Sequence, residues 1–265
     1  MGTSKAALPW HGSTLLRRTV GVVARGTSGP VLVVRAPGQE LPDLPADIRL
    51  CDDPRDGLGP MQGLATGLRA LVGRAEVAFC CSTDLPFLHP AFVRRVVAAM
   101  DDDVDVVLPM ARGYRQPLAA AYRPGVADEL DVLLAEGMLK PAFLLDRVRV
   151  RRLDDDALLG DRALSSADPG LDSVLNVNET ADYELAHARP APEVRVERFG
   201  VLTANGNRGP RTVRAATIAC AADATGLRLD RHVVAAVNGD RVTRDGTQPL
   251  VEGDTVTFVS ADAGG

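Results

Sequence analysis

The sequence predicts a doubly wound α/β domain followed by a smaller α+β domain. Short apolar runs alternate with segments of helical periodicity between residues 15 and 136, as in α/β proteins. The run at residues 77–81 is apolar throughout, which is typical of a strand buried on both faces of a parallel sheet. A stiff Arg-Pro-Ala-Pro-Glu linker lies at residues 189–193. In the roughly 70 residues after it, the expected strands and helix follow a different spacing. We therefore expect domains at residues 1–189 and 194–265.

The elements of the first domain follow in order from periodicity. Residues 60–72 place Met61, Leu64, Leu68 and Leu71 on one helical face. Further helices are expected at residues 15–23, 89–100 and 126–136. Strands are expected at residues 31–34, 48–51, 77–81, 104–110 and 117–122. This alternation indicates a doubly wound, Rossmann-like sheet with helices on both faces.

The second domain has shorter elements. Strands are expected at residues 194–199, 232–237 and 256–259, and an Ala-rich helix at residues 217–227. Asn238-Gly239 is a strong signal for a tight turn after a strand.

Composition excludes several function classes. The chain has 265 residues and a net charge of −5, without a basic patch for nucleic acid or a membrane surface. No apolar stretch approaches the roughly 18 residues of a membrane span, and the start lacks a signal peptide core. The four cysteines show no Cys-x-x-Cys spacing, and the adjacent Cys80 and Cys81 in an apolar run fit small core residues better than metal ligands or a disulfide framework. We expect a cytoplasmic protein with neither a nucleic-acid nor a membrane partner.

Two loops at strand ends carry candidate site residues. Asp84 follows the apolar run 77–81, where ligands of open α/β sheets bind, and its carboxylate suits Mg²⁺. The same residue could cap the next helix or shape a turn. Gly57, Gly59 and Gly63 allow a backbone to approach a phosphate or ribose closely, although an ordinary strand-to-helix connection has the same composition.

Three polar side chains near the ends of the first domain are further candidates. Lys5 could neutralise a triphosphate, or it could be a flexible terminal lysine. Asn176 and Asn178 carry amides that can donate to a phosphate or a pterin, or they could form a plain turn.

The order and spacing of these elements resemble the molybdenum cofactor guanylyltransferases. Residues 1–8, Met-Gly-Thr-Ser-Lys-Ala-Ala-Leu, resemble the end of the signature loop of that family. Gly59-Pro-Met-Gln-Gly63 resembles its Gly-Pro-Leu-x-Gly element, and Asp84-Leu-Pro-Phe its metal-binding Asp-x-Pro segment. Gln116-Pro-Leu-Ala-Ala-Ala-Tyr122 resembles its Pro-Leu-x-Ala-x-Tyr strand, and Asn176-Val-Asn-Glu-Thr180 its Asn-x-Asn-Thr element. The resemblance spans nearly 190 residues.

The resemblance implies a Mg²⁺-dependent transfer of GMP from GTP to molybdopterin, with release of pyrophosphate. It implies catalytic roles for Lys5 on the triphosphate and for Asp84 as the metal ligand. The other residues implied at the nucleotide are Gly2, Asp52, Gly59 and Gly63, and those implied on the molybdopterin side are Asn176 and Asn178. Transfer from CTP, a sugar phosphate acceptor and an inactive scaffold remain alternatives.

Two departures from the family pattern carry expectations of their own. The family begins with a buried strand and a Leu-Ala-Gly-Gly-x-Ser-x-Arg loop, and this chain starts just after that loop. We expect that the start codon has been assigned too late and that the missing strand would lie centrally in the sheet. Without the loop, we expect the chain to bind GTP weakly. Arg35 stands where some members carry an Asn that helps to recognise guanine, which leaves the base open.

Residues 194–265 resemble sulfur carriers of the β-grasp, ubiquitin-like type, such as the small subunit of molybdopterin synthase or the thiamine sulfur carrier. The matching segments are Val237-Asn-Gly-Asp240, Pro249-Leu-Val-Glu-Gly-Asp254, residues 256–259 and the terminal Gly264-Gly265. The resemblance implies an activating enzyme that adenylylates the terminal carboxylate, and a sulfur donor. Alternatively, the two glycines simply end a flexible tail.

Overall fold

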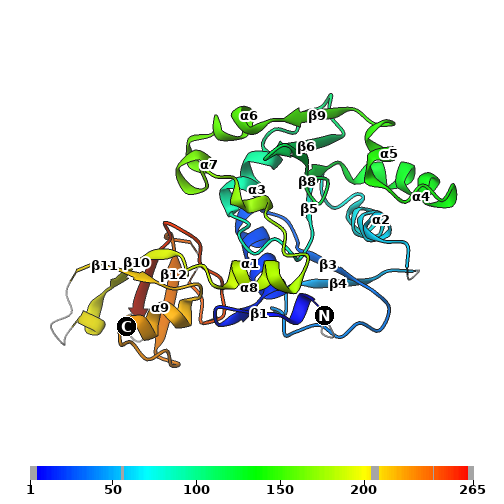
Figure 1. Ribbon diagram of the computed structural model, residues 1–265. Coiled ribbons are helices and arrows are strands. Elements are labelled where there is room, and N and C mark those ends of the chain that lie inside the picture. Colours follow the sequence, from blue (N-terminus) through cyan, green and yellow to red (C-terminus); the bar gives the residue numbers. More distant parts are fainter. Residues whose placement is uncertain (1–4, 55–56, 204–208, 241, 262–265) are drawn as a thin grey trace. The chain divides into compact units, whose positions relative to one another are not determined.

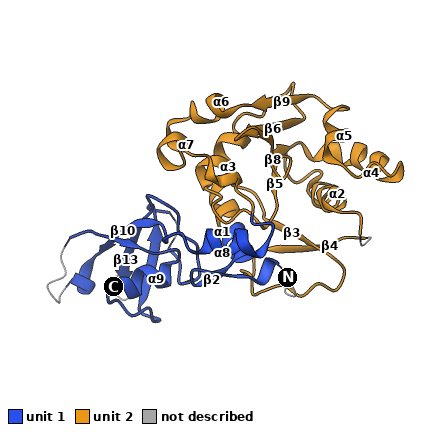
Figure 2. Cartoon of the chain, in the orientation of Figure 1, with its two compact units in different colours: residues 1–21, 177–265 blue, residues 22–176 orange. Residues whose placement is uncertain are grey.

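The computed structural model describes residues 5–54, 57–203, 209–240 and 242–261. Contacts divide the chain into two compact units, which Figure 2 colours separately. Unit 1 contains Met1–Gly21 and Val177–Gly265, and unit 2 contains Val22–Asn176. Helix α1 (Leu15–Gly26) runs through the boundary between them. The units thus join the start of the chain to its last third, and the division at residues 189–193 stays a prediction.

Unit 2 is a mixed α/β structure (Figure 1). Strands β3 (Leu32–Arg35) and β4 (Arg49–Asp52) pair in parallel. A second sheet has the order β5-β8-β6-β7, with β9 paired to β6. Its strands are β5 (Ala78–Cys81), β6 (Val106–Ala111), β7 (Tyr114–Arg115), β8 (Ala119–Tyr122) and β9 (Val150–Leu153). In the described part of the chain, β3 and β5 each pair with a strand on one side only.

The parallel surroundings expected for the apolar run at residues 77–81 are wrong. Strand β5 pairs with β8 in the antiparallel sense, and β8 is also antiparallel to β6. The cause is a hairpin between β6 and β7, in which Arg112 and Gly113 have φ values of 55° and 81°. Two consecutive residues with positive φ make a tight turn that reverses the chain, and β8 therefore runs back along β6.

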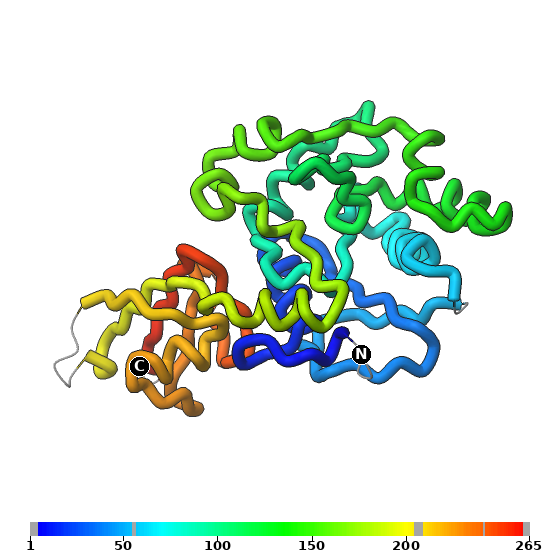
Figure 3. Tube along the Cα trace, in the orientation of Figure 1, coloured from blue at the N-terminus to red at the C-terminus, as the bar shows by residue number. Residues whose placement is uncertain are grey.

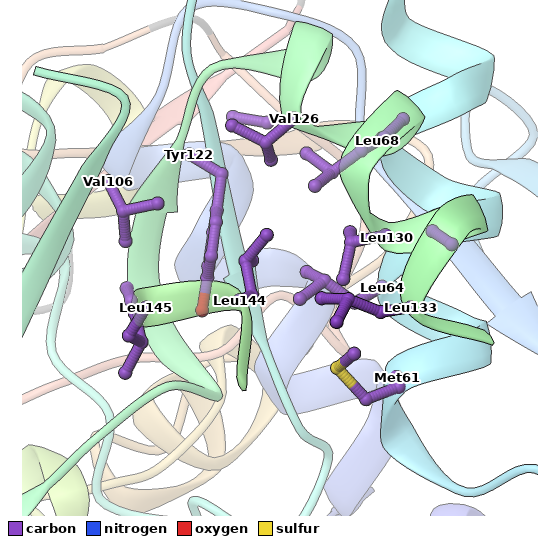
Figure 4. Packing of buried hydrophobic residues seen from close by; sticks show 14 of the residues in the cluster. Met61, Leu64, Leu68, Val106, Tyr122, Val126, Leu130, Leu133, Leu144 and Leu145 are labelled. Carbon is purple, nitrogen blue, oxygen red and sulfur yellow. The ribbon is translucent and has the colours of Figure 1, made fainter. Parts of the chain in front are cut away.

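The helices of unit 2 cover its sheets. They are α2 (Pro60–Leu71), α3 (Pro90–Val97), η2 (Pro124–Val126), α4 (Ala127–Ala135), α5 (Pro141–Leu145), α6 (Asp155–Leu159), α7 (Arg162–Ala167) and η3 (Asp172–Val174). Helix α2 contacts α4 and strands β3, β4 and β5. Figure 4 shows Met61, Leu64 and Leu68 of α2 facing Leu130 and Leu133 of α4. The predicted apolar face of residues 60–72 is therefore confirmed as core.

Unit 1 contains a four-stranded sheet of order β11-β10-β13-β12. Its strands are β10 (Glu193–Arg198), β11 (Arg211–Arg214), β12 (Val233–Val237) and β13 (Thr255–Ser260). The central pair β10 and β13 is parallel, and both outer pairs are antiparallel. Helix α9 (Ile218–Ala224) begins at Thr217, whose side chain accepts a hydrogen bond from the backbone of Cys220. Ile218 and Ala222 of α9 pack in one core with Val196 and Phe258.

Residues 5–21 pack against this sheet domain within unit 1, as the tube in Figure 3 traces. They form η1 (Lys5–Ala7), β1 (Pro9–Trp10), β2 (Ser13–Thr14) and the first turns of α1. The remaining elements of the unit are α8 (Thr180–His187) and η4 (Gly200–Thr203). Arg17 forms an ion pair with Asp245, and Arg18 Nη1 donates to Leu250 O at 3.0 Å. These bonds bind α1 to the loop before β13.

An aromatic cluster joins β1 to α8 in unit 1. The rings of His11 and His187 are stacked, with centroids 4.6 Å apart and planes 3° apart. Trp10 meets both histidine rings edge-on. Burial, followed by the positive charges of His187 and Arg18, lowers the pKa of His11 below its usual range. The cluster therefore favours a neutral His11.

None of the helices in the described ranges combines the length and the apolar character of a membrane span.

Candidate functional site

Asp84 lies directly after strand β5. The pairing of β5 with β8 continues past Cys81, because the backbone N–H of Ser82 donates to Leu118 O at 3.1 Å. The hydroxyl of Ser82 donates to the carboxylate of Asp84. Leu85 and Leu88, which follow Asp84 in the chain, are buried. Asp84 is thus a half-exposed carboxylate held at a strand end by an adjacent hydroxyl, and sequence reasoning assigned no role to Ser82.

The segment opposite Asp84 is fixed by Tyr122. The buried phenol of Tyr122 donates to Pro117 O at 2.6 Å. The backbone N–H of Gln116 donates to Pro109 O at 2.9 Å. Both bonds fix the backbone of residues 116–118 beside Ser82. The Gln116–Tyr122 motif therefore has a structural role next to the turn that carries Asp84.

The neighbouring cysteines do not supply thiolates. Desolvation by the surrounding protein, followed by the negative charge of Asp84, raises the pKa of Cys81 to about 12. Desolvation also raises the pKa of Cys80. Both thiols stay protonated at neutral pH, in line with the expected role as small core residues. Within the described ranges, no three His, Cys, Asp or Glu side chains gather as metal ligands. Asp84 offers a single carboxylate.

The glycine loop between β4 and α2 has the open geometry that the sequence indicates. Gly57 and Gly59 have φ values of 81° and 68°, a region that L-residues rarely occupy. Gly59 is the N-cap of α2 and has no side chain to cap the helix, and Pro60 follows at the first position. Asp52, at the end of β4, accepts a hydrogen bond from Arg35 Nε at 2.6 Å. The carboxylate of Asp52 is therefore engaged in an ion pair with Arg35.

Lys5 is held against the asparagine element in unit 1. Its Nζ donates to Val177 O at 3.0 Å, although 172 positions separate the two residues in the chain. The backbone N–H groups of Asn178 and Glu179 both donate to Asp182, at 3.0 Å each, and this fixes the start of α8. Lys5 is thus bonded to the backbone next to Asn178 within unit 1, unlike a flexible terminal lysine, and its role on the triphosphate stays a prediction.

The predicted site residues fall into two groups that the structure describes separately. Lys5 and Asn178 lie in unit 1, whereas Asp52, Gly59, Gly63 and Asp84 lie in unit 2, with Asn176 as its last residue. Gly2, Gly264 and Gly265 lie outside the described residues.

A cavity of about 490 Å³ in unit 2 lies away from Asp84. Its lining includes Glu76, which precedes β5, and Arg123, which follows the antiparallel β8. These residues mark the end of the strands opposite to Asp84, so this cavity is not the candidate site.

The mixed α/β unit, with a carboxylate after strand β5 and a glycine loop before a helix, defines an α/β protein of the nucleotidyltransferase class. The family model described as "MobA-like NTP transferase domain" matches residues 1–150. The chain belongs to this family.

Proteins named "Probable molybdenum cofactor guanylyltransferase" are among its relatives. The one from Mycobacterium bovis (strain BCG / Pasteur 1173P2) is 38% identical over 150 residues, which cover 55% of this chain and 73% of the relative. The one from Mycobacterium ulcerans (strain Agy99) is 34% identical over 196 residues, which cover 72% of this chain and 86% of the relative.

Solved structures share the fold. Molybdopterin-guanine dinucleotide biosynthesis protein A from Archaeoglobus fulgidus superposes with a TM-score of 0.53 at 21% identity, over 70% of this chain and 90% of its own. Rv0371c from Mycobacterium tuberculosis H37Rv superposes with a TM-score of 0.51 at 19% identity, over 71% of this chain and 92% of its own. At these identities, the likeness concerns the fold alone.

Proposed function

We propose that this chain is a Mg²⁺-dependent nucleotidyltransferase that joins GMP, taken from GTP, to molybdopterin. The observation that carries the proposal is the half-exposed Asp84 carboxylate, which Ser82 orients at the end of β5 in a chain of this family. The names of the relatives from M. bovis and M. ulcerans support the choice of base and acceptor.

The reaction is a displacement at phosphorus. An oxygen of the terminal phosphate of molybdopterin attacks the α-phosphorus of GTP, a new P–O bond forms, and the bond to pyrophosphate breaks. Such a step requires positioning and charge neutralisation and needs no protein nucleophile. A Mg²⁺ ion, when bound, neutralises charge on the phosphates.

Each candidate residue has a definite part in this scheme. A single carboxylate fits Mg²⁺, because this ion usually keeps several waters and takes phosphate oxygens as further ligands. Asp84 would hold the ion, and Ser82 would orient Asp84. Lys5 would place its positive charge on the triphosphate, while Asn176 and Asn178 would donate to the phosphate of the pterin.

The experiment is pyrophosphate release by the chain extended through its upstream codons, with molybdopterin and Mg²⁺, and with GTP and CTP supplied separately. We expect turnover with GTP, and a loss of about 10²-fold or more in Asp84→Asn, the scale for removing one main electrostatic contact. Asp146→Asn is the matched control, since Asp146 is an exposed residue after α5. If only CTP supports turnover, the proposed nucleotide donor is CTP and not GTP. If Asp84→Asn keeps the turnover of the wild type, Asp84 only shapes the turn.

We further propose that residues 194–265 form a β-grasp sulfur carrier. Two features support the proposal: the order β11-β10-β13-β12 with a parallel central pair, and the packing of α9 on this sheet. The carboxylate of Gly265 would attack the α-phosphorus of ATP in an activating enzyme and release pyrophosphate. A sulfide equivalent from a sulfur donor would then displace AMP and leave a thiocarboxylate.

Removal of Gly265 tests the carrier proposal. The terminal glycines suit a narrow partner site because they add no side chain to the tail. We expect intact-mass spectrometry to show replacement of one oxygen by sulfur after incubation with an activating enzyme, ATP and a sulfur donor. The chain without Gly265 should show no such gain and should keep its thermal unfolding curve. The same mass gain in both chains would contradict the proposal.

A further inference from the structure

The segment between α7 and Asn176 carries a buried carboxylate that no step of the proposed reaction uses. Asp168 follows α7 directly and is 8% exposed. Its Oδ1 accepts the backbone N–H of Asp172 at 2.7 Å, and its Oδ2 accepts that of Ser173 at 2.9 Å. Hydrogen bonds to a carboxylate are stronger than those between neutral groups, and they stabilise a charge that burial would otherwise disfavour. Asp168 therefore fixes the backbone of the segment that leads to Asn176.

The hydroxyl of Ser173 joins this segment to the turn that follows Asp84. Ser173 is fully buried, and its Oγ accepts the backbone N–H of His89 at 3.1 Å. His89 is the N-cap of α3 and ends the turn, which the bond from Leu88 N–H to Leu85 O at 3.1 Å closes. The end of the turn that begins with Asp84 is therefore fixed by a side chain 84 positions further along the chain.

The hairpin between β6 and β7 also anchors the loop at residues 168–174. Arg112 Nη1 donates to Gly170 O at 2.7 Å and to the carboxylate of Asp172 at 2.9 Å. Arg112 and Leu171 have φ values of 55° and 51°. Residues other than glycine are strained in this left-handed region, and they persist there only where the surrounding contacts determine the backbone. Such strain is concentrated at functional sites, which points to a role for this loop beyond connection.

Strand directions place the loop at the edge of the sheet that carries Asp84. Strands β5 and β6 both run antiparallel to β8, so they are parallel to each other and their carboxyl ends lie at one edge. Asp84 follows β5, and the turn at Arg112 follows β6. Helices α3 and α7, which flank the turn and the loop, lie side by side (Figure 1). Because the chain continues from this loop into Asn176, the loop connects the proposed metal ligand to a residue proposed for the acceptor.

We propose that Asp168 and Ser173 are positioning residues of the transfer site, which keep the carboxylate of Asp84 in register with the amide of Asn176. The inference rests on the proposed nucleotidyltransferase function and assigns to it two residues that touch neither nucleotide nor acceptor. The attacking oxygen must lie in line with the α-phosphorus and the leaving pyrophosphate. A misplacement of about 1 Å can cost about 10²-fold in rate. Buried polar groups that are all hydrogen-bonded make their surroundings rigid, and this network would limit such a displacement.

The variants remove the network in steps. Ser173→Ala removes the acceptor of the His89 N–H, whereas Asp168→Asn keeps one of the two carboxylate acceptors and Asp168→Ala keeps neither. Ser166→Ala, at an exposed position of α7, is the matched control. Each change is made in the chain extended through its upstream codons. Pyrophosphate release with molybdopterin gives kcat, and calorimetric titration with Mg·GTP gives the affinity and the number of binding sites.

Alignment and folding predict different results in these measurements. We expect kcat to fall about 10- to 100-fold in Ser173→Ala, the scale for a small misplacement of reacting groups. The affinity and the number of sites for Mg·GTP should stay close to those of the wild type, because Ser82 still orients Asp84. Along the Asp168 series, kcat should be lower in Asp168→Asn than in the wild type and lowest in Asp168→Ala. Ser166→Ala should behave as the wild type.

Two results would overturn the inference. An unchanged kcat in both Ser173→Ala and Asp168→Asn would show that the network does not serve the reaction. A loss of kcat matched by an equal loss of Mg·GTP binding sites would make Asp168 and Ser173 parts of the fold only. If Asp168→Ala does not fold, the two milder variants decide.

Failure of the proposed function would give another pattern. A wild type that binds Mg·GTP but releases no pyrophosphate with molybdopterin would refute the transfer and leave the positioning to a second measurement. In amide NMR spectra, Ser173→Ala should shift the backbone N–H signals of both Asp84 and Asn176, whereas Ser166→Ala should not. Unshifted signals in Ser173→Ala would refute the positioning by itself. A wild type that binds no Mg·GTP would refute both the function and the inference.

Discussion

Gly21, in the middle of α1, lies where the helix meets the C-terminal sheet domain inside unit 1. A Cβ on Gly21 would stand 2.4 Å from Pro249 Cγ and 2.5 Å from Pro249 Cδ. The proline ring cannot rotate away, and its backbone is held by the bond from Leu250 N to Ala216 O at 2.8 Å. Gly→Ala in a helix normally stabilises it by about 1 kcal/mol, whereas overpacking costs about 1–3 kcal/mol. We therefore expect Gly21→Ala to lower the free energy of unfolding by up to about 2 kcal/mol.

The assay is urea unfolding followed by the fluorescence of Trp10, the single tryptophan, which is 3% exposed in unit 1. The same change is made in a Pro249→Ala background, where the ring atoms are absent. There, Gly21→Ala should recover the helix propensity and stabilise unit 1 by up to about 1 kcal/mol. A higher urea midpoint for Gly21→Ala alone would refute the reasoning, as would the same loss of stability in both backgrounds.

Two further predictions concern single side chains. Tyr122→Phe removes the only side-chain donor described for Pro117 O. This change should lower the free energy of unfolding of unit 2 by about 1 kcal/mol, measured by urea unfolding followed by circular dichroism. An unchanged urea midpoint would argue against the hydrogen bond. The pKa of His11 is lowered in the folded chain, so the unfolded chain binds that proton more readily. The stability linked to neutral His11 should be complete above about pH 6.5 and fall as the pH drops through the lower folded-state pKa. In His11→Phe, the unfolding midpoint should therefore change less between about pH 5 and 7 than in the wild type.

Local periodicity was sufficient for most elements, because burial of one face imposes the same spacing wherever a helix packs. The helix expected at residues 60–72 is α2, and its apolar face is core. The helix expected at residues 15–23 continues to Gly26. The direction of β8 was not predictable from apolar runs, since parallel and antiparallel strands share them. The turn at Arg112-Gly113 decides that direction, and an Arg with positive φ has no local signal.

The candidate site divides in the same way. Asp84 at the end of β5 and the glycines before α2 followed from sequence, because a strand end and a helix start are local features. The hydrogen bond between Lys5 and Val177 spans 172 positions, and nothing near Lys5 in the sequence distinguishes it from a flexible terminal lysine. The partner of Asp52 is likewise not a sequence neighbour, because Arg35 comes from another strand.

By itself, the sequence determined the α/β class of the first part, the strand-rich character of the last part, and the residue types that can bind a nucleotide. These properties depend on periodicity, turn residues and local order, which the sequence carries directly. Only the tertiary structure decided the direction of β8, the place of residues 5–21 beside the C-terminal sheet, and the pairing of Asp52 with Arg35. Each of these depends on contacts between distant segments, and their free energies are set by packing that local sequence does not encode.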